Sequence, residues 1–323
     1  MRIGLIYNAE AGEAGELDEL VHNIERHDHD VVIVGPPAHG VEHLLAKNID
    51  AVVAAGGDGT IAASALALRG SPVPLGILPM GTANNVAVSL GIPRELEDAI
   101  ALWSVESPRA LDTGVASGAW GERPFIESVG GGLVTHGIAV MDRQATTSPT
   151  TAEQLARALR SHGDVLDLLA PAVWRFTIDG ETIDGEYLLL EVLNTSAVGP
   201  NLALAPGASP YDGMFTVVAA TVSDRAALAE YLRALAAGAP APLSLPSWQA
   251  TEVTIEAGDR LHVDDDIVGA PGHPLTRIRI EPGAVRVLAP PASGAAAARA
   301  AIDTATGWPP AQALLAPSLS AWI

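Results

Sequence analysis

The sequence predicts an α/β domain with a parallel sheet, followed by a second, β-rich domain of antiparallel, sandwich-like type. Three observations predict this fold class. Short apolar runs alternate with helix-like stretches in the first third of the chain. Longer strand candidates with turn pairs between them follow from about Thr113. The length of 323 residues also favours two domains over one or three.

The first third contains four apolar runs that we expect to be buried strands. Runs without polar alternation are typical of a parallel sheet that helices cover on both faces. The strand candidates are Ile3–Tyr7, Asp30–Val34, Ala51–Ala55 and Leu75–Leu78. The helix candidates between them are about Gly15–His27, Val41–Lys47 and Ile61–Leu68. Ligands bind at the carboxyl ends of the strands in such sheets, so the residues after each strand matter most.

The remainder of the chain has the pattern of an antiparallel β domain. Its strand candidates are Ala172–Ile178, Tyr187–Asn194, Phe215–Thr221, Glu252–Ala257, Thr276–Glu281 and Val285–Ala289. The turn pairs are Asp179-Gly180, Asp184-Gly185, Gly258-Asp259 and Pro282-Gly283. Helices are expected at Thr151–Leu169 and Ser223–Ala237. We therefore expect domains at residues 1–113 and 114–290, with the tail 291–323 packing back on the first domain.

Composition and charge exclude several classes of protein. The net charge of −20 repels nucleic acid, and aromatic residues are too few for a base-stacking surface. The absence of cysteine excludes disulfides and thiolate chemistry. No apolar run reaches the roughly 18 residues of a membrane span, so we expect a cytoplasmic protein. The tail, with Trp308 and Trp322, is the one candidate for peripheral contact with a membrane surface.

A glycine-rich stretch directly follows the third strand candidate and reads Gly56-Gly57-Asp58-Gly59-Thr60. Glycine lets main-chain N–H groups approach a phosphate closely, and a following helix adds free donors and partial positive charge. Asp58 would repel phosphate unless a divalent cation lay between them, and Mg²⁺ takes oxygen ligands. The stretch therefore predicts a phosphate and metal site. The alternative is an ordinary turn in which Asp58 caps the helix.

A second stretch of this kind follows the fourth strand candidate and reads Pro79-Met80-Gly81-Thr82-Ala83-Asn84-Asn85. Gly81 and Thr82 can turn tightly and donate to phosphate, whereas Asn84 and Asn85 can cap a helix or bind ligand oxygens. A turn with a helix cap is the alternative here as well. Because both stretches end strands of one sheet, they predict a two-sided phosphate cradle.

These two stretches resemble the diacylglycerol kinase catalytic-domain family, which includes bacterial lipid kinases and sphingosine kinases. The resemblance extends over roughly Arg2 to Ala289. It implies a nucleotide-binding kinase domain, a β-rich domain for the lipid acceptor, an active site in the cleft, and ATP and Mg²⁺ as cofactors. The residues that it implies for nucleotide binding are Asn8, Gly56, Gly57, Asp58, Gly59, Thr60, Gly81, Thr82, Asn84 and Asn85.

The resemblance also assigns metal ligands. It implies that Asp112 organises the catalytic Mg²⁺ together with Asp58. It implies a structural metal held by Asp212 and the main-chain oxygens of Ser209 and Met214. Turn-forming roles for Asp112 and Asp212, each close to a glycine, are the alternatives.

An acidic run, Asp264-Asp265-Asp266, stands where the family has Asp-Gly-Glu. Asp264 matches the family's Asp, and Asp266 stands in for its Glu. The resemblance implies that one of them is the general base, and a carboxylate can accept a hydroxyl proton during phosphoryl transfer. Adjacent acids repel one another, which should raise the pKa of at least one. A solvated acidic hairpin is the alternative.

Two positions depart from the family pattern. The first strand ends in Asn8-Ala9-Glu10, without the Pro and Ser of the family's Asn-Pro-x-Ser-Gly. The second stretch ends in Asn85, where the family's Gly-Thr-x-Asn-Asp ends in an acid. The metal network would lose one charge there, leaving Asp58 and Asp112 as its main acids, so we expect weaker activity or a shifted metal.

The leading hypothesis is an ATP-dependent lipid kinase that transfers the γ-phosphate to a hydroxyl of diacylglycerol or a related lipid. Asp58, with Asp264 or Asp266, would carry the catalysis. The expected partner is a lipid at a membrane surface, not nucleic acid. The sequence leaves open whether the protein forms a homodimer. One alternative is a kinase of a soluble hydroxylated acceptor, such as NAD or a sugar. The other is a catalytically weak or silent nucleotide- or lipid-binding protein on the same scaffold.

Overall fold

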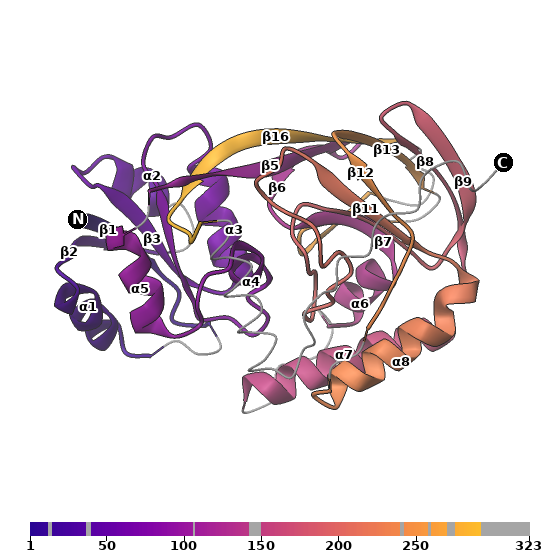
Figure 1. Cartoon of the computed structure of the whole chain (residues 1–323), viewed down its shortest axis with the longest axis horizontal. Coiled ribbons are helices and arrows are strands. Elements are labelled where there is room, and N and C mark those ends of the chain that lie inside the picture. The colour runs from indigo at the N-terminus through magenta and orange to yellow at the C-terminus, as the bar shows by residue number, and fades with distance from the viewer. Residues whose placement is uncertain are drawn as a thin grey trace.

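The structure is a computed structural model that describes residues 1–11, 15–36, 40–105, 107–141, 150–239, 242–257, 260–269 and 275–291. Figure 1 shows two halves side by side, with the N-terminus in the first. The long strands β5 (Arg109–Gly118) and β16 (Thr276–Val287) run between the halves along one edge of the molecule. Two helices, α7 (Thr151–Leu168) and α8 (Arg225–Ala236), lie along the other edge of the second half.

The first half is a parallel sheet in the order β2-β1-β3-β4, as the apolar runs predict. Its strands are β1 (Arg2–Tyr7), β2 (Asp30–Gly35), β3 (Ala51–Gly56) and β4 (Leu75–Pro79). Its helices are α1 (Leu17–Arg26), α2 (Gly40–Leu45), α3 (Asp58–Ala67), α4 (Asn85–Leu90) and α5 (Leu96–Val105). Strands β3 and β4 are buried throughout, because α3 packs on β3 and α5 packs on β4.

The second half is a sandwich of antiparallel sheets. The first sheet is the continuation of the parallel sheet beyond β4. It runs through β16, β13 (Glu252–Ala257), β8 (Ala172–Ile178) and β9 (Glu181–Tyr187). Beside it, β5 pairs with β6 (Gly121–Phe125). The second sheet has the order β12-β11-β10-β7-β14-β15. Its strands are β7 (Ser128–Gly132), β10 (Leu189–Leu193), β11 (Phe215–Ala220), β12 (Ser247–Ala250), β14 (Leu261–Val263) and β15 (Asp266–Val268).

Strand β10 shows how the second sheet serves two cores. Leu190 and Val192 face the first sheet, where they pack with side chains such as Phe176 of β8. Leu189 and Leu193 point the opposite way, into a cluster that the helices α6 (Leu133–Met141), α7 and α8 complete. Successive side chains of a strand point to opposite faces, so a strand covered on both sides reads as a continuous apolar run.

These sheets confirm the predicted fold class. The predicted turn at Asp179-Gly180 is also confirmed, since these residues join β8 to β9 with φ of 44° and 97°. The predicted turn at Asp184-Gly185 is wrong, because both residues lie inside β9 and pair with β8. The turn expected at Gly258-Asp259 lies outside the described residues.

Two strand candidates near the end of the chain proved to be one strand. Thr276–Glu281 and the start of Val285–Ala289 form β16, which has a register shift between Glu281 and Val285. Gly283 lies in this bulge with φ of 61°, a conformation that a side chain would strain. The Pro282-Gly283 pair therefore bends a strand and does not end it.

The sequence pattern missed the elements around residues 85–141, and β7 shows why. It reads Ser-Val-Gly-Gly-Gly, which resembles a loop. In the fold, a Cβ on Gly130 would lie 2.2 Å from the Glu191 carboxylate, and one on Gly131 would lie 2.0 Å from the Trp174 ring. The glycines therefore make room for side chains from other strands, a requirement that no local pattern reveals.

Apolar packing shows how the chain returns to its first half. Val285, Val287 and Leu288 join the core of the parallel sheet, and Val287 pairs with Leu75 of β4. The predicted boundary at residue 113 falls inside β5, a strand shared by both halves. Residues 292–323, for which packing on the first domain was predicted, lie outside the described residues.

Candidate active site

The two glycine-rich stretches lie at adjacent strand ends. Gly56 at the end of β3 pairs with Pro79 at the end of β4, and Tyr7 at the end of β1 pairs with Ala55. The chain leaves β1 toward β2 on one side and leaves β3 toward β4 on the other. The carboxyl ends of β1 and β3 therefore flank the topological switch point, the usual ligand site of an open α/β sheet.

The first stretch is a very short connection from strand to helix. Gly57 is the N-cap residue of α3, which begins at Asp58, so the predicted start at Ile61 is three residues too late. Asp58 is in the first turn, where the helix dipole favours a negative charge. The Asn8 side chain donates to Thr60 Oγ1 at 3.1 Å, which ties the end of β1 to this turn. Gly59 is exposed, and a Cβ there would meet nothing within 4 Å.

The second stretch packs against the first. A Cβ on Gly81 would lie 2.5 Å from Gly57 Cα, so the two backbones meet at a pair of glycines. Asn84 has φ of 56° and closes the loop on itself, because its amide accepts from Gly81 N and donates to Gly81 O, both at 2.8 Å. Asn84 therefore shapes the loop. Thr82 donates to Gln154 of α7 at 3.0 Å, which links the loop to the second half.

The Asp58 carboxylate accepts a backbone hydrogen bond and lies near another acid. Its Oδ1 accepts from Val86 N at 3.0 Å, at the start of α4. Burial raises the pKa of Asp58 to about 6, a backbone hydrogen bond from Val86 lowers it, and the charge of Asp265 raises it further. Asp58 therefore holds its charge only because amides donate to it, and a cation would stabilise it further.

Asp264 and Asp265 of the acidic run form the two-residue turn between β14 and β15, and Asp266 is the first residue of β15. Asp264 has φ of 49°, and its carboxylate accepts from the backbone N–H groups of residues 126, 127 and 128 at 3.1, 2.8 and 3.2 Å. Burial raises its pKa to about 6 against these hydrogen bonds. Asp266 is exposed and pairs with Arg123 at 2.6 Å. Of the two predicted base candidates, Asp264 is partly buried, whereas Asp266 lies at the surface.

Two further residues complete this acidic cluster. Glu127, in the turn between β6 and β7, is 6% exposed, and burial together with the charges of Asp58, Asp265 and Asp264 raises its pKa. Asn85 joins it from the first half, because Asn85 Nδ2 donates to Glu127 Oε2 at 3.2 Å and to Gly199 O at 2.8 Å. The structure thus brings Asp58, Asn85, Glu127, Asp264 and Asp265 to one place.

Asp112 has partners of its own. Its two carboxylate oxygens accept from Gly213 N and Gly283 N, each at 2.7 Å, and burial raises its pKa. The nearby acid that raises this pKa further is Asp212. Asp112 therefore joins β5 to the 210–213 turn and to the β16 bulge. The expected magnesium role of Asp112 stays a prediction.

The predicted structural metal site is built around a turn. Asp212 is exposed, and its Oδ1 accepts from Met214 N at 3.0 Å, while Gly213 has φ of 73°. These features fit the turn interpretation that the sequence left open. No group of three or more His, Asp or Glu side chains among the described residues is placed to bind a metal ion. The metal site at Ser209, Asp212 and Met214 stays a prediction.

We expect Asp112→Ala to destabilise the protein by about 1–3 kcal/mol, because the partly buried hydrogen bonds from Gly213 N and Gly283 N lose their charged acceptor. Thermal or urea unfolding measures this change. The exposed Asp167→Ala on α7 is the control and should change stability little. Unchanged stability of Asp112→Ala would show that water replaces the carboxylate at Gly213 and Gly283.

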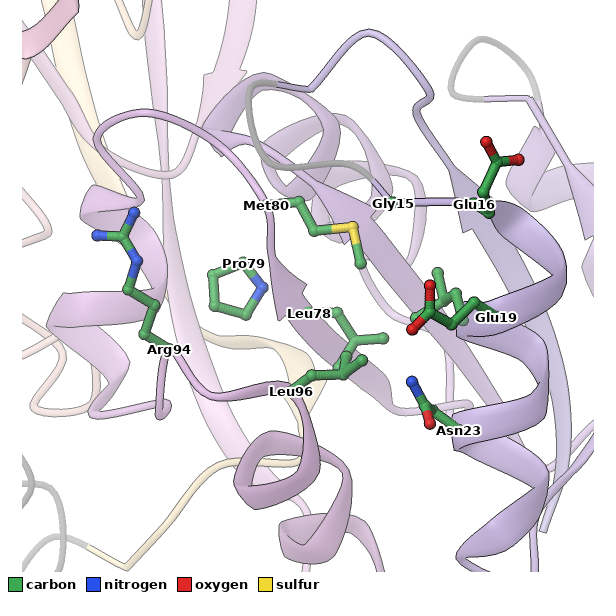
Figure 2. Close-up of a pocket in the computed structure, with 10 residues that line it drawn as sticks. Gly15, Glu16, Glu19, Asn23, Leu78, Pro79, Met80, Arg94 and Leu96 are labelled. Atoms are coloured by element: carbon green, nitrogen blue, oxygen red, sulfur yellow. The ribbon is translucent and has the colours of Figure 1, made fainter. Parts of the chain in front are cut away.

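A cavity of about 230 Å³ opens beside the second stretch (Figure 2). One wall is the first part of α1, with Glu19 and Asn23, and the other is the end of β4 together with Met80 and Arg94. Figure 2 shows the Met80 side chain pointing toward the α1 wall, with Leu78 and Leu96 between the walls. The cavity thus combines an apolar floor with a few polar groups, as small-molecule sites do.

The described residues contain no helix that is both long and apolar enough to cross a membrane. Comparison with known proteins then decides the family. Residues 2–116 match the diacylglycerol kinase catalytic domain, and residues 132–289 match the YegS C-terminal NAD kinase beta sandwich-like domain. The chain is 31% identical to a diacylglycerol kinase of Bacillus subtilis over 244 residues, which make up 72% of this chain and 77% of the relative.

The chain belongs to the diacylglycerol kinase catalytic-domain family. A second relative, a diacylglycerol kinase of Mycobacterium tuberculosis, is 30% identical over 282 residues, with 80% of this chain and 84% of the relative covered. A solved structure described as a diacylglycerol kinase from Bacillus anthracis (strain Sterne) has a TM-score of 0.65 at 18% identity. It covers 90% of this chain and 97% of that chain, which supports the fold. The family relationship supports a phosphotransferase.

Sequence reasoning missed Glu127 and Asp265 in this family member. Asp265 stands where the family has glycine, so the family pattern assigns it no role. Glu127 lies outside the motifs, between two short strands that were not expected. One signal could have found it: a single acid in the otherwise apolar and small-residue run from Phe125 to Leu133.

Proposed function

We propose that this protein is an ATP-dependent kinase that transfers the γ-phosphate to a lipid hydroxyl. One observation carries the proposal. Two glycine-rich turns touch each other at adjacent strand ends, and the acidic cluster around Asp58 lies beside them. The turns can bind phosphates with backbone N–H groups, whereas the acids suit a metal and a proton acceptor.

The residues of the site have separate roles in phosphoryl transfer. The N-terminus of α3 and the backbone of Gly57 and Gly81 bind and orient the phosphates. Asp58 would hold Mg²⁺, an ion that proteins commonly bind with one or two carboxylates. When bound, Mg²⁺ neutralises charge on the phosphoryl oxygens. The Asn85 amide oxygen, which is buried and has no hydrogen-bond partner, is a donor of the kind that fits this ion.

Asp264 is the proposed general base. Its Oδ2 accepts one backbone N–H, whereas Oδ1 accepts two, so Oδ2 keeps a lone pair for an acceptor hydroxyl. Its pKa of about 6 is closer to neutral than that of an ordinary aspartate, which favours proton transfer near neutral pH. The three N–H groups also hold the carboxylate in one orientation.

The nucleoside of ATP is assigned to the cavity in Figure 2. Met80, which lines it, directly precedes the Gly81 turn that would bind the phosphates. The carboxylate of Glu19 and the amide of Asn23 can accept hydrogen bonds from an exocyclic amino group. The partly exposed side chain of Leu96 and the Met80 side chain suit the ring faces.

The decisive experiment uses labelled ATP with Mg²⁺ and a total lipid extract in mixed micelles, followed by organic extraction and mass spectrometry. Labelled phospholipid in the organic phase supports the proposal. Label on a water-soluble product would identify a soluble acceptor instead. Nucleotide binding by calorimetry without ATP consumption under any acceptor would identify a silent binding protein, the alternative that Asn85 motivates.

A pair of glycine variants tests the phosphate cradle. Gly59→Ala should leave the melting temperature unchanged or slightly higher, because the site has open space and alanine favours a helix by about 1 kcal/mol over glycine. It should nevertheless weaken ATP binding, because the new methyl group would occupy phosphate space. Calorimetric titration with ATP and thermal unfolding measure both effects.

Gly81→Ala is the contrasting variant. Its methyl group would meet Gly57 Cα at 2.5 Å, so the two turns would have to separate. We expect both the melting temperature and the ATP affinity to fall. Tight ATP binding by Gly59→Ala would show that the phosphates lie elsewhere.

A further inference from the structure

The position of Asn85 raises a chemical problem that the structure answers. The family pattern has an acid there, and this chain has a neutral amide. The proposed function, on which this inference rests, needs enough negative charge to hold Mg²⁺ beside the phosphates. A carboxylate from another part of the chain could supply the missing charge, provided that it reaches the same place.

Glu127 reaches that place. Its Oε2 accepts from Asn85 Nδ2 at 3.2 Å, so the carboxylate is in direct contact with the residue that replaces the acid. The two residues are 42 positions apart and come from different halves of the molecule. The amide cannot be turned around, because Gly199 O, at 2.8 Å from Asn85 Nδ2, can only accept a hydrogen bond.

The orientation of Asn85 leaves an oxygen available. Asn85 is 2% exposed, and its Oδ1 has no hydrogen-bond partner. A buried polar atom without a partner is costly, and in native proteins such an atom usually binds a water molecule or an ion. Because Oδ1 and Nδ2 of Asn85 belong to one amide, Oδ1 lies beside the hydrogen bond from Nδ2 to Glu127. Amide and carboxylate oxygens are both ligands of hard divalent cations.

The negative charges around Glu127 favour binding of a cation. The groups whose charges act on it are Asp58, Asp265 and Asp264, all of them negative. A buried carboxylate in such surroundings is stable only when it is protonated or when a cation is bound. A purely structural role would be served by the protonated form, for which glutamine is a close substitute. A metal role needs the charge.

We propose that Glu127 supplies the carboxylate that Asn85 lacks, so that Glu127 and Asp58 form the acidic pair that holds the divalent cation. The acid has moved from the start of α4 to the turn between β6 and β7. Its carboxylate lies 3.2 Å from the Asn85 amide nitrogen, and Asn85 serves as a neutral oxygen ligand beside the acids.

Binding of Mn²⁺ tests this proposal without any turnover. Electron paramagnetic resonance of free Mn²⁺ is followed during titration of the full chain, with and without a non-hydrolysable ATP analogue. Glu127→Gln should weaken Mn²⁺ binding by about 10- to 100-fold. The double variant Asn85→Asp/Glu127→Gln should restore most of the affinity, because it returns the acid to α4. Glu186→Gln, at an exposed position of β9, is the control.

Unchanged Mn²⁺ affinity in Glu127→Gln would overturn the proposal and indicate a protonated, structural Glu127. Failure of the double variant to bind better than Glu127→Gln would also count against it. If Glu127→Gln does not fold, Glu127→Asp and Glu127→Asn are compared instead. Glu127→Asp keeps the charge and should bind Mn²⁺ more tightly than Glu127→Asn, and equal binding by the two variants would overturn the proposal.

The outcome is separate from that of the kinase proposal. If the wild-type protein phosphorylates no lipid but its Mn²⁺ binding depends on Glu127, the proposed function fails and this inference stands. If the protein phosphorylates lipid and Glu127→Gln binds Mn²⁺ normally, this inference fails alone.

Discussion

Asp58→Asn should lower kcat by about 10²- to 10³-fold, because the site loses a charge that acts on the phosphoryl group through the bound cation. The substituted side chain is nearly isosteric, and its amide oxygen can still accept from Val86 N. The fold should therefore persist. Steady-state assays with ATP, Mg²⁺ and the lipid acceptor measure the loss. Asp167→Asn, an exposed change on α7, is the matched control.

The same variant should be more stable than the wild-type protein at neutral pH. The pKa of Asp58 is raised from 3.8 to about 6, so the folded protein binds the proton more tightly than the unfolded chain. The resulting stability is complete below about pH 4 and is lost as the pH rises through 6. Asp58→Asn removes this part of the pH dependence. Thermal unfolding from pH 4 to pH 8 measures it.

Two results for Asp58→Asn would contradict these expectations. Full turnover in Asp58→Asn would remove Asp58 from the metal site. An unchanged pH dependence of stability would mean that the carboxyl is better solvated than its buried surroundings indicate. Loss of activity together with higher stability is the pattern expected of a functional acid kept in an unfavourable environment.

Asp264→Asn should reduce kcat by about 10²- to 10⁴-fold if its carboxylate is the general base. It should also destabilise the fold by about 1–3 kcal/mol, because one amide NH₂ would replace an oxygen that accepts backbone N–H groups. Activity assays and urea unfolding measure the two losses. Over the pH range below 6, the wild-type rate should fall as Asp264 becomes protonated.

Asp266→Asn, in the same acidic run, is the matched control. Asp266 is exposed and pairs with Arg123 at the surface, where ion pairs contribute about 0–1 kcal/mol. We expect little change in kcat or stability. If Asp266→Asn were as damaging as Asp264→Asn, the base would be Asp266 or the whole turn would be disturbed. A large loss in Asp265→Asn alone would move the role to Asp265.

Much of the kinase half could be predicted from the sequence. Buried parallel strands are continuous apolar runs, and Ala51–Ala55 and Leu75–Leu78 match β3 and β4 closely. The glycine-rich turns could be predicted because glycine's conformational freedom is a local property. The pattern also predicted that both turns lie at one sheet edge, since parallel strands end on the same side.

The helix α4 and strand β7 could not be predicted in this way. The helix has only six residues, too few for a periodic apolar face, and its N-cap residue Asn84 is left-handed. The strand is rich in glycine because side chains from β10 and β8 occupy its surroundings. In both cases the structure depends on contacts with distant parts of the chain.

The sequence by itself determined the two glycine-rich turns, the position of Asp58 between a strand and a helix, and the kinase family. Only the tertiary structure decided which acids share the site with Asp58. It brought Glu127 and Asp264 near Asp58, placed the Asp112 carboxylate on Gly213 N and Gly283 N, and placed Asp266 at the surface. The reason is physical: local conformation follows from neighbouring residues, whereas the electrostatic environment of a carboxylate depends on groups that only folding brings within a few ångströms.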